Sequence, residues 1–503
     1  MLKRRPVVLL IFLSLLAVLI SVSLVSAATE VDTSELRGAV TLEGVRAHQA
    51  ALQAIADSNG GTRVATSPGY EESGEYVEGL LSGAGYQVDR QNFDFPFFQE
   101  NSPPTLEQVS PNSVVYPPND VAGFFTMEYS AGGDVTALIQ AVDVTIPPAA
   151  TPSSTSGCEA SDFTGFTAGR IALIQRGTCN FSVKVENAAA AGAAGVIIFN
   201  EGQAGRTEGF NGTLGGPVAN IPSVGASFAI GEELYNLSQQ GDVEVHIIVD
   251  AISETRSTFN VIATTPGGRD DRVVVVGAHL DSVAEGPGIN DNGSGTATIL
   301  EIALQMADLG IEPRNKVVFA FWGAEEAGLH GSAYYVSQLS ASQIKKIAVN
   351  LNFDMVGSPN YARFVYDGDG SATPLAGPNG SKNIEQVFLE YFGEQNLETE
   401  PTAFDGRSDY GPFIAVGIPA GGLFTGAEEI NPDNGIAYDP CYHQACDTFA
   451  NNNDDAIDEM SDAAAHAVLT FAETTSAVNG TDKGKGKGKW ANAMEYRGSH
   501  LLK

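Results

Sequence analysis

Four short segments of the sequence place acids and histidines directly after apolar runs. His279, Asp281 and Asp291 lie in the glycine-rich stretch GAHLDSVAEGPGINDNGSGT, residues 277–296. The other three segments are VVFAFWGAEEAG with Glu325 and Glu326, IAVNLNFDMVG with Asp354, and DPCYHQACD with His443. In open α/β sheets, the loops at the carboxyl ends of the strands form the binding site. We therefore expect these side chains to meet at one edge of a sheet.

Each segment alone has an ordinary structural explanation. A single histidine after a strand is more often a hydrogen-bonded residue than a ligand, a Glu-Glu pair is usually a solvated surface, and aspartate among glycines usually stabilises a turn. Together the segments would supply two imidazoles and several carboxylates to one place, a mixture that suits zinc. The number of acids favours two metals, which need one bridging carboxylate and one free carboxylate as general base.

The elements that must position these loops are strands and helices in alternation. Beyond residue 255 the pattern predicts a doubly wound α/β domain. Its expected strands are 259–264, 272–278, 316–322, 347–353 and 419–424. Ahead of it, residues 33–60 read as an amphipathic helix, and residues 67–88 as a turn and a second helix that ends at Gly85. The Pro-, Asn- and Ser-rich stretch 96–118 predicts a loop.

A separate unit is expected at residues 135–250. It contains the short strand patterns RIALIQRG, AGVIIFN and VEVHIIV, with the small-residue helix pattern NFSVKVENAAAAGA between the first two. The unit divides the main domain into a first part, residues 33–134, and a larger part, residues 255–475. It would restrict access to the site, bind partners, or serve as a rigid lid without recognition of its own.

Length and charge limit the class of protein. A chain of 503 residues, 43% of them hydrophobic, accommodates two or three globular domains. The formal net charge of −34 argues against a nucleic-acid partner, because nucleic acid requires a basic surface. Such acidity fits a secreted protein but identifies no substrate, and the sequence does not indicate an oligomeric state.

The two ends of the chain predict processing and disorder. Residues 1–28 have a basic start, a long apolar run and then Ser26-Ala27-Ala28, as in a cleavable signal peptide. The alternative is a retained membrane anchor, since the apolar run is nearly long enough to span a bilayer. Cleavage is favoured by the small residues and would leave a secreted protein without a membrane anchor. The alternating Lys-Gly of residues 478–503 predicts a basic, disordered tail.

The four cysteines Cys158, Cys179, Cys441 and Cys446 indicate two disulfides in an exported protein. Three pairings are allowed, of which the local pairs Cys158–Cys179 and Cys441–Cys446 are the simplest. A cysteine-rich zinc site is disfavoured, because the sequence has no C-x-x-C spacing.

The sequence resembles the M28 family of zinc aminopeptidases with two co-catalytic metals, in particular the secreted bacterial leucine-type enzymes. The resemblance covers most of residues 35–475 and is carried by GAHLDS, GINDNGSG, WGAEEAGLHGS, NFDMVG, RSDYGPF and DPCYHQACD. The inserted unit resembles a protease-associated (PA) domain, most clearly in CNFSVKVENAAAAGAAGVIIFN. The resemblance implies an α/β fold of the zinc-exopeptidase (phosphorylase/hydrolase-like) type, with a mixed sheet flanked by helices and an inserted, mainly β PA domain.

The resemblance also implies a set of metal ligands. His279 and Asp354 would hold one zinc ion, Glu326 and His443 would hold the other, and Asp291 would bridge both. The glycines around Asp291 would let its backbone approach two ions without a steric penalty. Zinc is preferred to manganese or cobalt through the resemblance alone. A structural calcium ion is a further candidate cofactor, with ligands that the sequence does not assign.

Three catalytic roles follow from the same resemblance. Glu325 would be the general base and acid, which takes a proton from a metal-bridging water and delivers it to the leaving amine. Tyr442 would donate a hydrogen bond to the developing oxyanion. Asp281 would accept a hydrogen bond from the far imidazole N–H of His279 and so orient that ring.

The implied substrate is a peptide with a free N-terminus, from which hydroxide between the two metals would release the first residue. Glu325 and Asp354 would hold the terminal ammonium, and a carbonyl near Arg407 would add to this. Met355 and Phe424 would line an apolar pocket for a Leu-like side chain, although plain core packing explains both residues equally well.

Three alternatives stay open. A carboxypeptidase or dipeptidase of the same fold would need a basic pocket for a terminal carboxylate, and the catalytic loops offer no Arg or Lys cluster beyond Arg407. A glutaminyl cyclase would need one zinc ion, whereas the full ligand set argues for two. A peptide-binding protein on an inactive peptidase scaffold is disfavoured, because Glu325 and every expected ligand are present.

Overall fold

The computed structural model describes residues 31–478. The expected signal peptide, residues 1–28, and the expected tail beyond residue 478 lie outside the described residues. Among the helices that are described, none combines the length and the apolar character needed to cross a bilayer.

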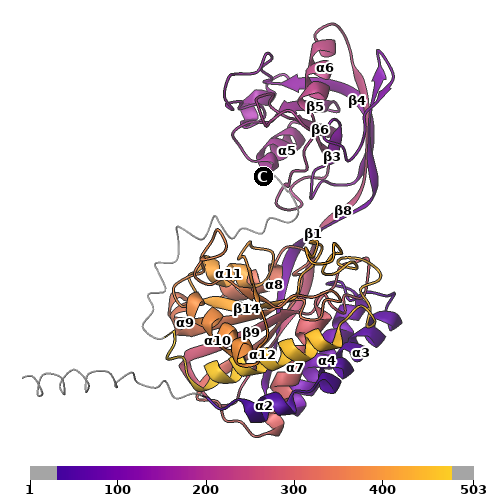
Figure 1. The fold of residues 1–503 in the computed structure, drawn as a ribbon. Helices are drawn as coiled ribbons and strands as arrows, with labels where there is room; N and C mark the ends of the chain where they lie inside the picture. Colours follow the sequence, from indigo (N-terminus) through magenta and orange to yellow (C-terminus); the bar gives the residue numbers. More distant parts are fainter. Residues whose placement is uncertain (1–30, 479–503) are drawn as a thin grey trace, which may run out of the picture.

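A mixed sheet forms the centre of the larger part of the molecule (Figure 1). Its parallel central strands are β9 (Arg269–His279), β10 (Asn315–Trp322), β11 (Ile347–Phe353) and β14 (Ala420–Phe424). On one side β8 (Glu244–Thr264) pairs antiparallel with β10, and on the other β12 (Phe364–Tyr366) pairs antiparallel with β14 and parallel with β13 (Glu400–Thr402). The five strands expected beyond residue 255 are confirmed.

Helices cover both faces of this sheet. One face packs against α2 (Ser34–Ala39), α3 (Leu42–Ser58), α4 (Pro68–Gly83), α7 (Gly293–Asp308), α10 (Ser381–Glu394) and α12 (Asp454–Glu473). The other packs against α8 (His330–Ser337), α9 (Ala341–Lys346) and α11 (Tyr410–Ala415). The valines of β9 alternate between the two cores, with Val274 and Val276 in the first and Val275 in the second. Burial on both faces holds the carboxyl end of β9 in place.

The N-terminal helices differ in one detail from the sequence prediction. Residues 33–60 form two helices rather than one, because the chain is extended at Thr41, whose hydroxyl accepts a hydrogen bond from Gly44 N and caps α3. The second expected helix is confirmed as α4, which starts with Ser67 as cap and Pro68 in its first turn.

The prediction of a loop at residues 96–118 is wrong. Most of this stretch lies in β1 (Gln87–Ser110), which pairs antiparallel with β8 along nearly its whole length. Prolines are tolerated there because β1 is an edge strand for most of its course, and because Pro103 and Pro104 fall where the register shifts.

The ribbon of β1 and β8 carries the smaller part of the molecule (Figure 1). Its further elements are β2 (Val114–Val115), β3 (Phe124–Thr126), β4 (Gly133–Val142), η1 (Ala160–Phe163), β5 (Ile171–Gln175), α5 (Phe181–Ala190), β6 (Gly195–Phe199), β7 (Ser223–Ala226) and α6 (Phe228–Ser238). The expected strand and helix patterns lie in β5, β6, β8 and α5. Because β3 pairs with β7 and Phe124 joins the same core as Val224, this packed unit begins ahead of residue 135.

Both disulfides join the nearest cysteines in the sequence. Cys158 pairs with Cys179, beside α5 in the smaller part, and Cys441 pairs with Cys446 in the loop that carries His443. The simplest of the three allowed pairings is therefore present in the structure.

Candidate active site

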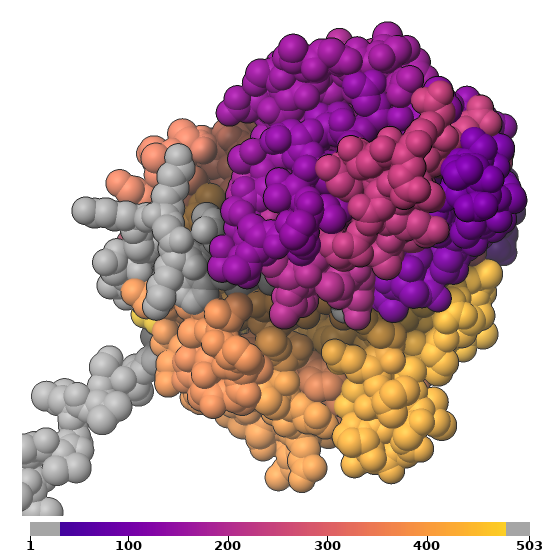
Figure 2. All heavy atoms as spheres, turned by 90° about the horizontal axis from the view of Figure 1, so that it is seen from above, coloured from indigo at the N-terminus to yellow at the C-terminus, as the bar shows by residue number. Residues whose placement is uncertain are grey.

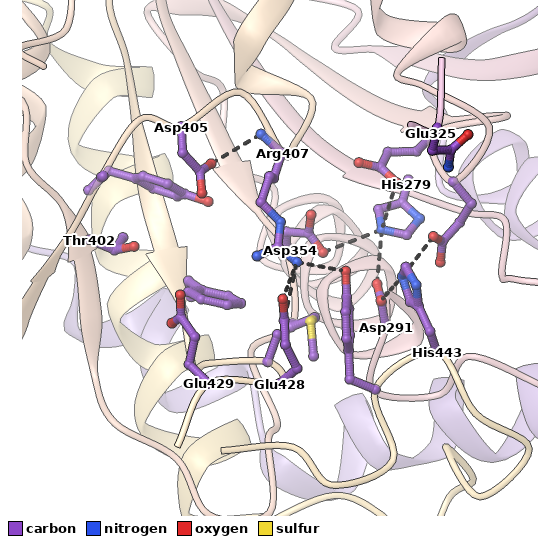
Figure 3. Close-up of a pocket in the computed structure, with 18 of the residues that line it drawn as sticks. His279, Asp291, Glu325, Asp354, Thr402, Asp405, Arg407, Glu428, Glu429 and His443 are labelled. Carbon is purple, nitrogen blue, oxygen red and sulfur yellow. Dashed lines mark hydrogen bonds and ion pairs between the residues drawn. The ribbon is translucent and has the colours of Figure 1, made fainter. Parts of the chain in front are cut away.

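The four segments with acids and histidines meet at the carboxyl edge of the parallel strands. His279 ends β9, the two glutamates follow β10, and Asp354 follows β11. These side chains and His443 line one cavity of about 1130 Å³, in which they point toward one another (Figure 3). The sheet thus brings together residues that lie up to 164 positions apart, as strand-end loops of an α/β sheet do.

Asp291 stands between two groups of ligand-type atoms. Its Oδ1 lies 3.2 Å from His279 Nε2, and its Oδ2 lies 3.3 Å from His443 Nε2 (Figure 3). His279 Nε2 is also 3.3 Å from Asp354 Oδ1, and His443 Nε2 is 3.0 Å from Glu326 Oε2. One carboxylate therefore faces two separate His–carboxylate pairs, one with each oxygen, which is the arrangement that a bridging ligand needs.

The donor set fits metal ions better than it fits a closed hydrogen-bond network. Glu326 Oε1 is buried and accepts no hydrogen bond, and the buried Asp354 Oδ1 has His279 Nε2 at 3.3 Å but no hydrogen bond of good geometry. Leaving a buried carboxylate oxygen without a donor costs free energy, and a bound cation would offset that cost. Ligand atoms of His279, Asp291 and Asp354 lie within 4.8 Å of one another, and so do those of Asp291, Glu326 and His443. Imidazole nitrogens and carboxylate oxygens are ligands that zinc takes in proteins.

The same crowding shifts the pKa values in the cluster. Burial lowers the pKa of His443, but the charges of Glu326 and Asp291 more than compensate and raise it to about 11. Burial and the charge of Asp291 raise the pKa of Glu326 to about 7. Burial likewise raises the pKa of Glu325 well above its usual value. Burying several carboxylates close together therefore costs free energy, and positive charge placed among them would reduce that cost.

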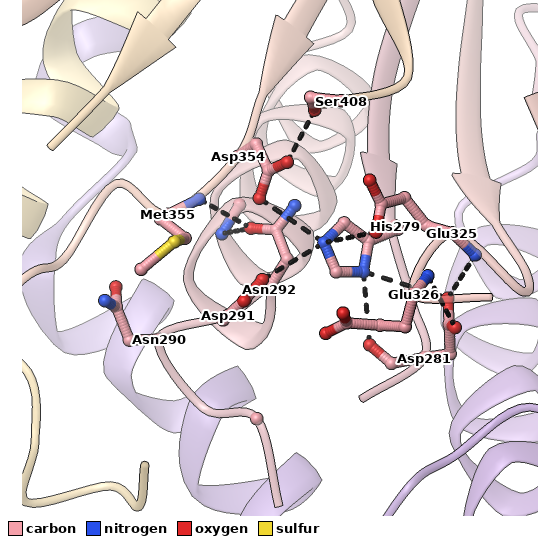
Figure 4. A network of polar contacts seen from close by, with 12 residues as sticks. His279, Asp281, Asn290, Asp291, Asn292, Glu325, Glu326, Asp354, Met355 and Ser408 are labelled. Atoms are coloured by element: carbon pink, nitrogen blue, oxygen red, sulfur yellow. Dashed lines mark hydrogen bonds and ion pairs between the residues drawn. The ribbon is translucent and has the colours of Figure 1, made fainter. Parts of the chain in front are cut away.

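The contacts of Asp281 differ from those implied by the family resemblance. His279 Nδ1 lies 3.2 Å from the main-chain oxygen of Asp281, whereas the Asp281 carboxylate is 3.7 Å away (Figure 4). That carboxylate instead accepts hydrogen bonds from the main-chain N–H groups of Glu325 and Glu326, at 3.2 and 3.4 Å. Asp281 therefore ties the end of β9 to the loop after β10, and holds both glutamates in place.

Tyr442 and Arg407 form a pair at the side of the cavity. The Tyr442 ring stacks on the His443 imidazole with 3.8 Å between ring centroids. Arg407 Nη2 donates to the Tyr442 hydroxyl at 3.2 Å and forms an ion pair of 2.9 Å with Glu428. Because the tyrosine oxygen accepts from Arg407, its own proton is free to point into the cavity.

The residues expected to line an apolar pocket do reach the cavity. Met355 and Phe424 both belong to its lining, together with Tyr366. Met355 has a positive φ of 52°, and Phe424 stacks on Phe364 with 5.8 Å between ring centroids. The Asp354 carboxylate beside them accepts a hydrogen bond from the Ser408 hydroxyl (Figure 4).

Arg63 supports the loop that carries Asp291, and the sequence analysis did not identify it. Its side chain is fully buried, and it donates from Nε to Pro287 O at 2.9 Å, from Nη2 to Gly288 O at 2.6 Å and from Nη1 to Leu280 O. Burial lowers its pKa to about 10 against the opposing effect of nearby acids, so it stays charged at neutral pH. Arg63 thus clamps the loop that carries Asp291. The only signal in the sequence is a lone arginine in the turn GGTRVATSPG.

Asp447 supports the bridging residue in a second way. Its carboxylate accepts hydrogen bonds from the main-chain N–H groups of Asn290 and Asp291, at 2.8 and 2.9 Å. It lies directly after the Cys441–Cys446 disulfide, so the loop that carries His443 also holds the backbone of Asp291. An aspartate in DPCYHQACD was visible in the sequence, but nothing local indicated this contact.

A further group of acids lies elsewhere. Asp367, Asp369 and Glu385 bring carboxylate oxygens within 4.8 Å of one another. Lys382 Nζ already lies 2.7 Å from Asp369, and Asp367 accepts hydrogen bonds from four main-chain N–H groups of the following turn. These contacts explain the acids as turn-stabilising residues, and we assign no calcium site to them.

Family models and similar proteins both point to an aminopeptidase with an inserted PA domain. The model of peptidase family M28 matches residues 260–468, and the PA domain model matches residues 142–234. An aminopeptidase of Pseudomonas aeruginosa is 47% identical over 85% of this chain and 80% of its own length. A probable leucine aminopeptidase 2 of Aspergillus oryzae is 44% identical over 70% of each chain.

Two solved structures share the fold. An aminopeptidase from Aneurinibacillus sp. strain AM-1 superimposes with a TM-score of 0.62 at 28% identity, covering 88% of this chain and 96% of its own. A zinc aminopeptidase from Bacillus subtilis gives a TM-score of 0.55 at 25% identity, covering 87% and 98%. The chain therefore belongs to peptidase family M28, as a metallo-aminopeptidase that carries a PA domain.

Proposed function

We propose that this enzyme is a two-zinc aminopeptidase that removes a Leu-like residue from the free N-terminus of peptides. The observation that carries the proposal is the position of Asp291, whose two carboxylate oxygens face His279 and His443 separately. One ion would be held by His279 and Asp354, the other by Glu326 and His443. The names of the relatives, which include leucine and zinc aminopeptidases, support the choice of metal and side chain.

Zinc in such a site lowers the pKa of water and polarises a carbonyl group. The rest of the chemistry falls to side chains of this protein. Glu325 is 6% exposed, and the hydrogen bond from its own N–H to Asp281 fixes its backbone at the edge of the cavity. A carboxylate at this position can take a proton from water and pass it to the leaving amine.

Tyr442 would stabilise the charge that develops on the scissile carbonyl oxygen. Its hydroxyl is oriented by Arg407, which donates to the phenol oxygen and leaves the phenol proton for substrate. Burial and the charges of Asp291 and Glu326 raise the pKa of Tyr442, so the group stays protonated and able to donate.

The negative charge of the cavity would select the free ammonium of the substrate. Glu325, which is buried, and Asp354, which is partly buried, lie beside His279 in the cavity, where charge interactions are stronger than in water. Met355 and Phe424 would surround an apolar side chain beside them. We also propose that the enzyme acts outside the cell, since two disulfides fit an oxidising compartment.

Replacing His443 by alanine should remove a ligand of the second zinc ion. We expect the metal content to fall from two ions to one. The affinity of the second site for zinc should drop by at least about 10-fold, since loss of a group that only supports a metal ligand already has an effect of that size. Metal content after dialysis measures this. His246→Ala, which removes a histidine that pairs with Asp134 in the smaller part of the molecule, is the control and should keep both ions. Two ions in His443→Ala would remove this residue from the site.

The function itself is tested with the protein recovered from the culture medium. We expect it to cleave Leu-p-nitroanilide but not the N-acetylated form, because acetylation removes the ammonium. A zinc chelator should abolish the cleavage, and added zinc should restore it. Cleavage of the acetylated substrate would contradict an aminopeptidase. Cleavage of neither substrate by protein with two bound ions would favour a carboxypeptidase or a binding protein.

A further inference from the structure

One side of the catalytic cavity is formed by the smaller part of the molecule. This part lines it with Val121 and Phe125, which precede the segment matched by the PA model, and with Gly209, Phe210 and Asn211, which lie within that segment. These residues share the cavity with His279, Asp291 and Glu325. Seen from above, the smaller part of the molecule (purple and magenta) covers part of the catalytic domain (orange and yellow) (Figure 2). We refer to Val121, Phe125 and Phe210 as the PA wall.

The PA wall is held firmly in place. Gly209 N donates to Val121 O at 2.6 Å, which joins its two segments. A Cβ on Gly209 would lie only 2.7 Å from Gly123 O, so the segments also pack closely. Phe210 is buried and stacks on Phe181 of α5 with 5.2 Å between ring centroids. The wall therefore presents a fixed surface to whatever enters the cavity.

The cavity has a buried end and an open end. At the buried end, His279 is 1% exposed and Glu325 is 6% exposed. Val121, on the PA wall, is 54% exposed, and Glu428 and Glu429 on the catalytic side are exposed as well. If the substrate ammonium is held among the buried acids, the remainder of the peptide must leave through the open end, between the PA wall and residues 427–429.

We propose that the PA wall binds the residues that follow the scissile bond, and that it makes the enzyme prefer peptides with apolar residues at the second and third positions. The inference rests on the proposed aminopeptidase function and adds a substrate class to it. Val121 and Phe125 offer apolar surface to such residues. The charge of Glu428 is paired with Arg407, and the exposed Glu429 leaves a net negative charge in the same space, which disfavours acidic residues there.

Two exposed valines of the smaller part of the molecule provide a matched test. Val121 lines the cavity, whereas Val115 in β2 is 68% exposed and does not. We would compare the unmodified enzyme with Val121→Asp and Val115→Asp, on leucine amide, Leu-Phe-Phe and Leu-Glu-Glu. The unmodified enzyme should favour Leu-Phe-Phe over Leu-Glu-Glu. Val121→Asp should lower kcat/KM for Leu-Phe-Phe about tenfold, mainly through KM, and leave leucine amide unchanged.

The outcomes separate the two proposals. Val115→Asp should have the same kcat/KM as the unmodified enzyme on every substrate. That result would exclude a general effect of an added charge in the smaller part of the molecule. An unchanged KM for Leu-Phe-Phe in Val121→Asp, or an equal loss on leucine amide, would overturn the role of the PA wall while the aminopeptidase function stands. Failure of the unmodified enzyme to cleave leucine amide would contradict the proposed function, and this inference with it.

Discussion

Glu325→Gln should lower kcat by about 10²–10⁴-fold and leave the metal content unchanged. Glutamine keeps the size of the side chain and the main-chain hydrogen bond to Asp281, but it cannot take a proton from water. Among the carboxylates closest to the two histidines, Glu325 has the longest contact, with Oε2 3.8 Å from His279 Nε2. Loss of this carboxylate should therefore affect proton transfer and spare metal binding. Steady-state kinetics and metal analysis of the same preparation measure both.

The neighbouring residue provides the control. Glu326 Oε2 lies 3.0 Å from His443 Nε2, and its Oε1 is buried without a hydrogen-bond partner. Glu326→Gln should therefore lose metal as well as activity, and excess zinc should restore part of the activity. For Glu325→Gln, excess zinc should restore none. Residual turnover above about one tenth of the unmodified rate in Glu325→Gln would assign the base to another residue.

Arg63→Met should destabilise the catalytic domain by about 3–5 kcal/mol. Three main-chain oxygens of residues 280–288 accept hydrogen bonds from the guanidinium, and all would lose their donor in the buried site. The positive charge that faces Asp281, Asp447 and Asp291 would vanish at the same time. Urea unfolding followed by the fluorescence of Trp322, which is buried in the catalytic domain, measures the change.

Two further variants separate positioning from stability. Arg63→Lys keeps the positive charge, so we expect this variant to fold. Lysine lacks the planar fork that reaches three carbonyl groups, so the variant should bind zinc more weakly than the unmodified protein. A chelator competition with the folded variant measures that affinity. Arg269→Met breaks an exposed ion pair with Asp271 and should change neither quantity. Equal zinc affinity in Arg63→Lys and the unmodified protein would limit Arg63 to a structural role.

Local sequence was enough for the features that depend on a few neighbouring residues. Strand and helix periodicity placed β9, β10, β11 and β14, because burial on both faces requires continuous apolar runs. The acids and histidines after those runs were identified because strand ends in an α/β sheet share one edge. The spacing of the cysteines favoured the local disulfides that are present.

Contacts between distant segments were not readable in this way. The register between β1 and β8 overrode the proline-rich composition of residues 96–118, since an edge strand with bulges tolerates proline. The carboxylate of Asp281 bonds to the loop after β10 rather than to His279, because the packing of two strands sets that distance. Arg63 and the PA wall join the site from outside the catalytic strands. Short-range sequence patterns record backbone propensity and burial, whereas these contacts depend on how packing brings together segments that are far apart in the sequence.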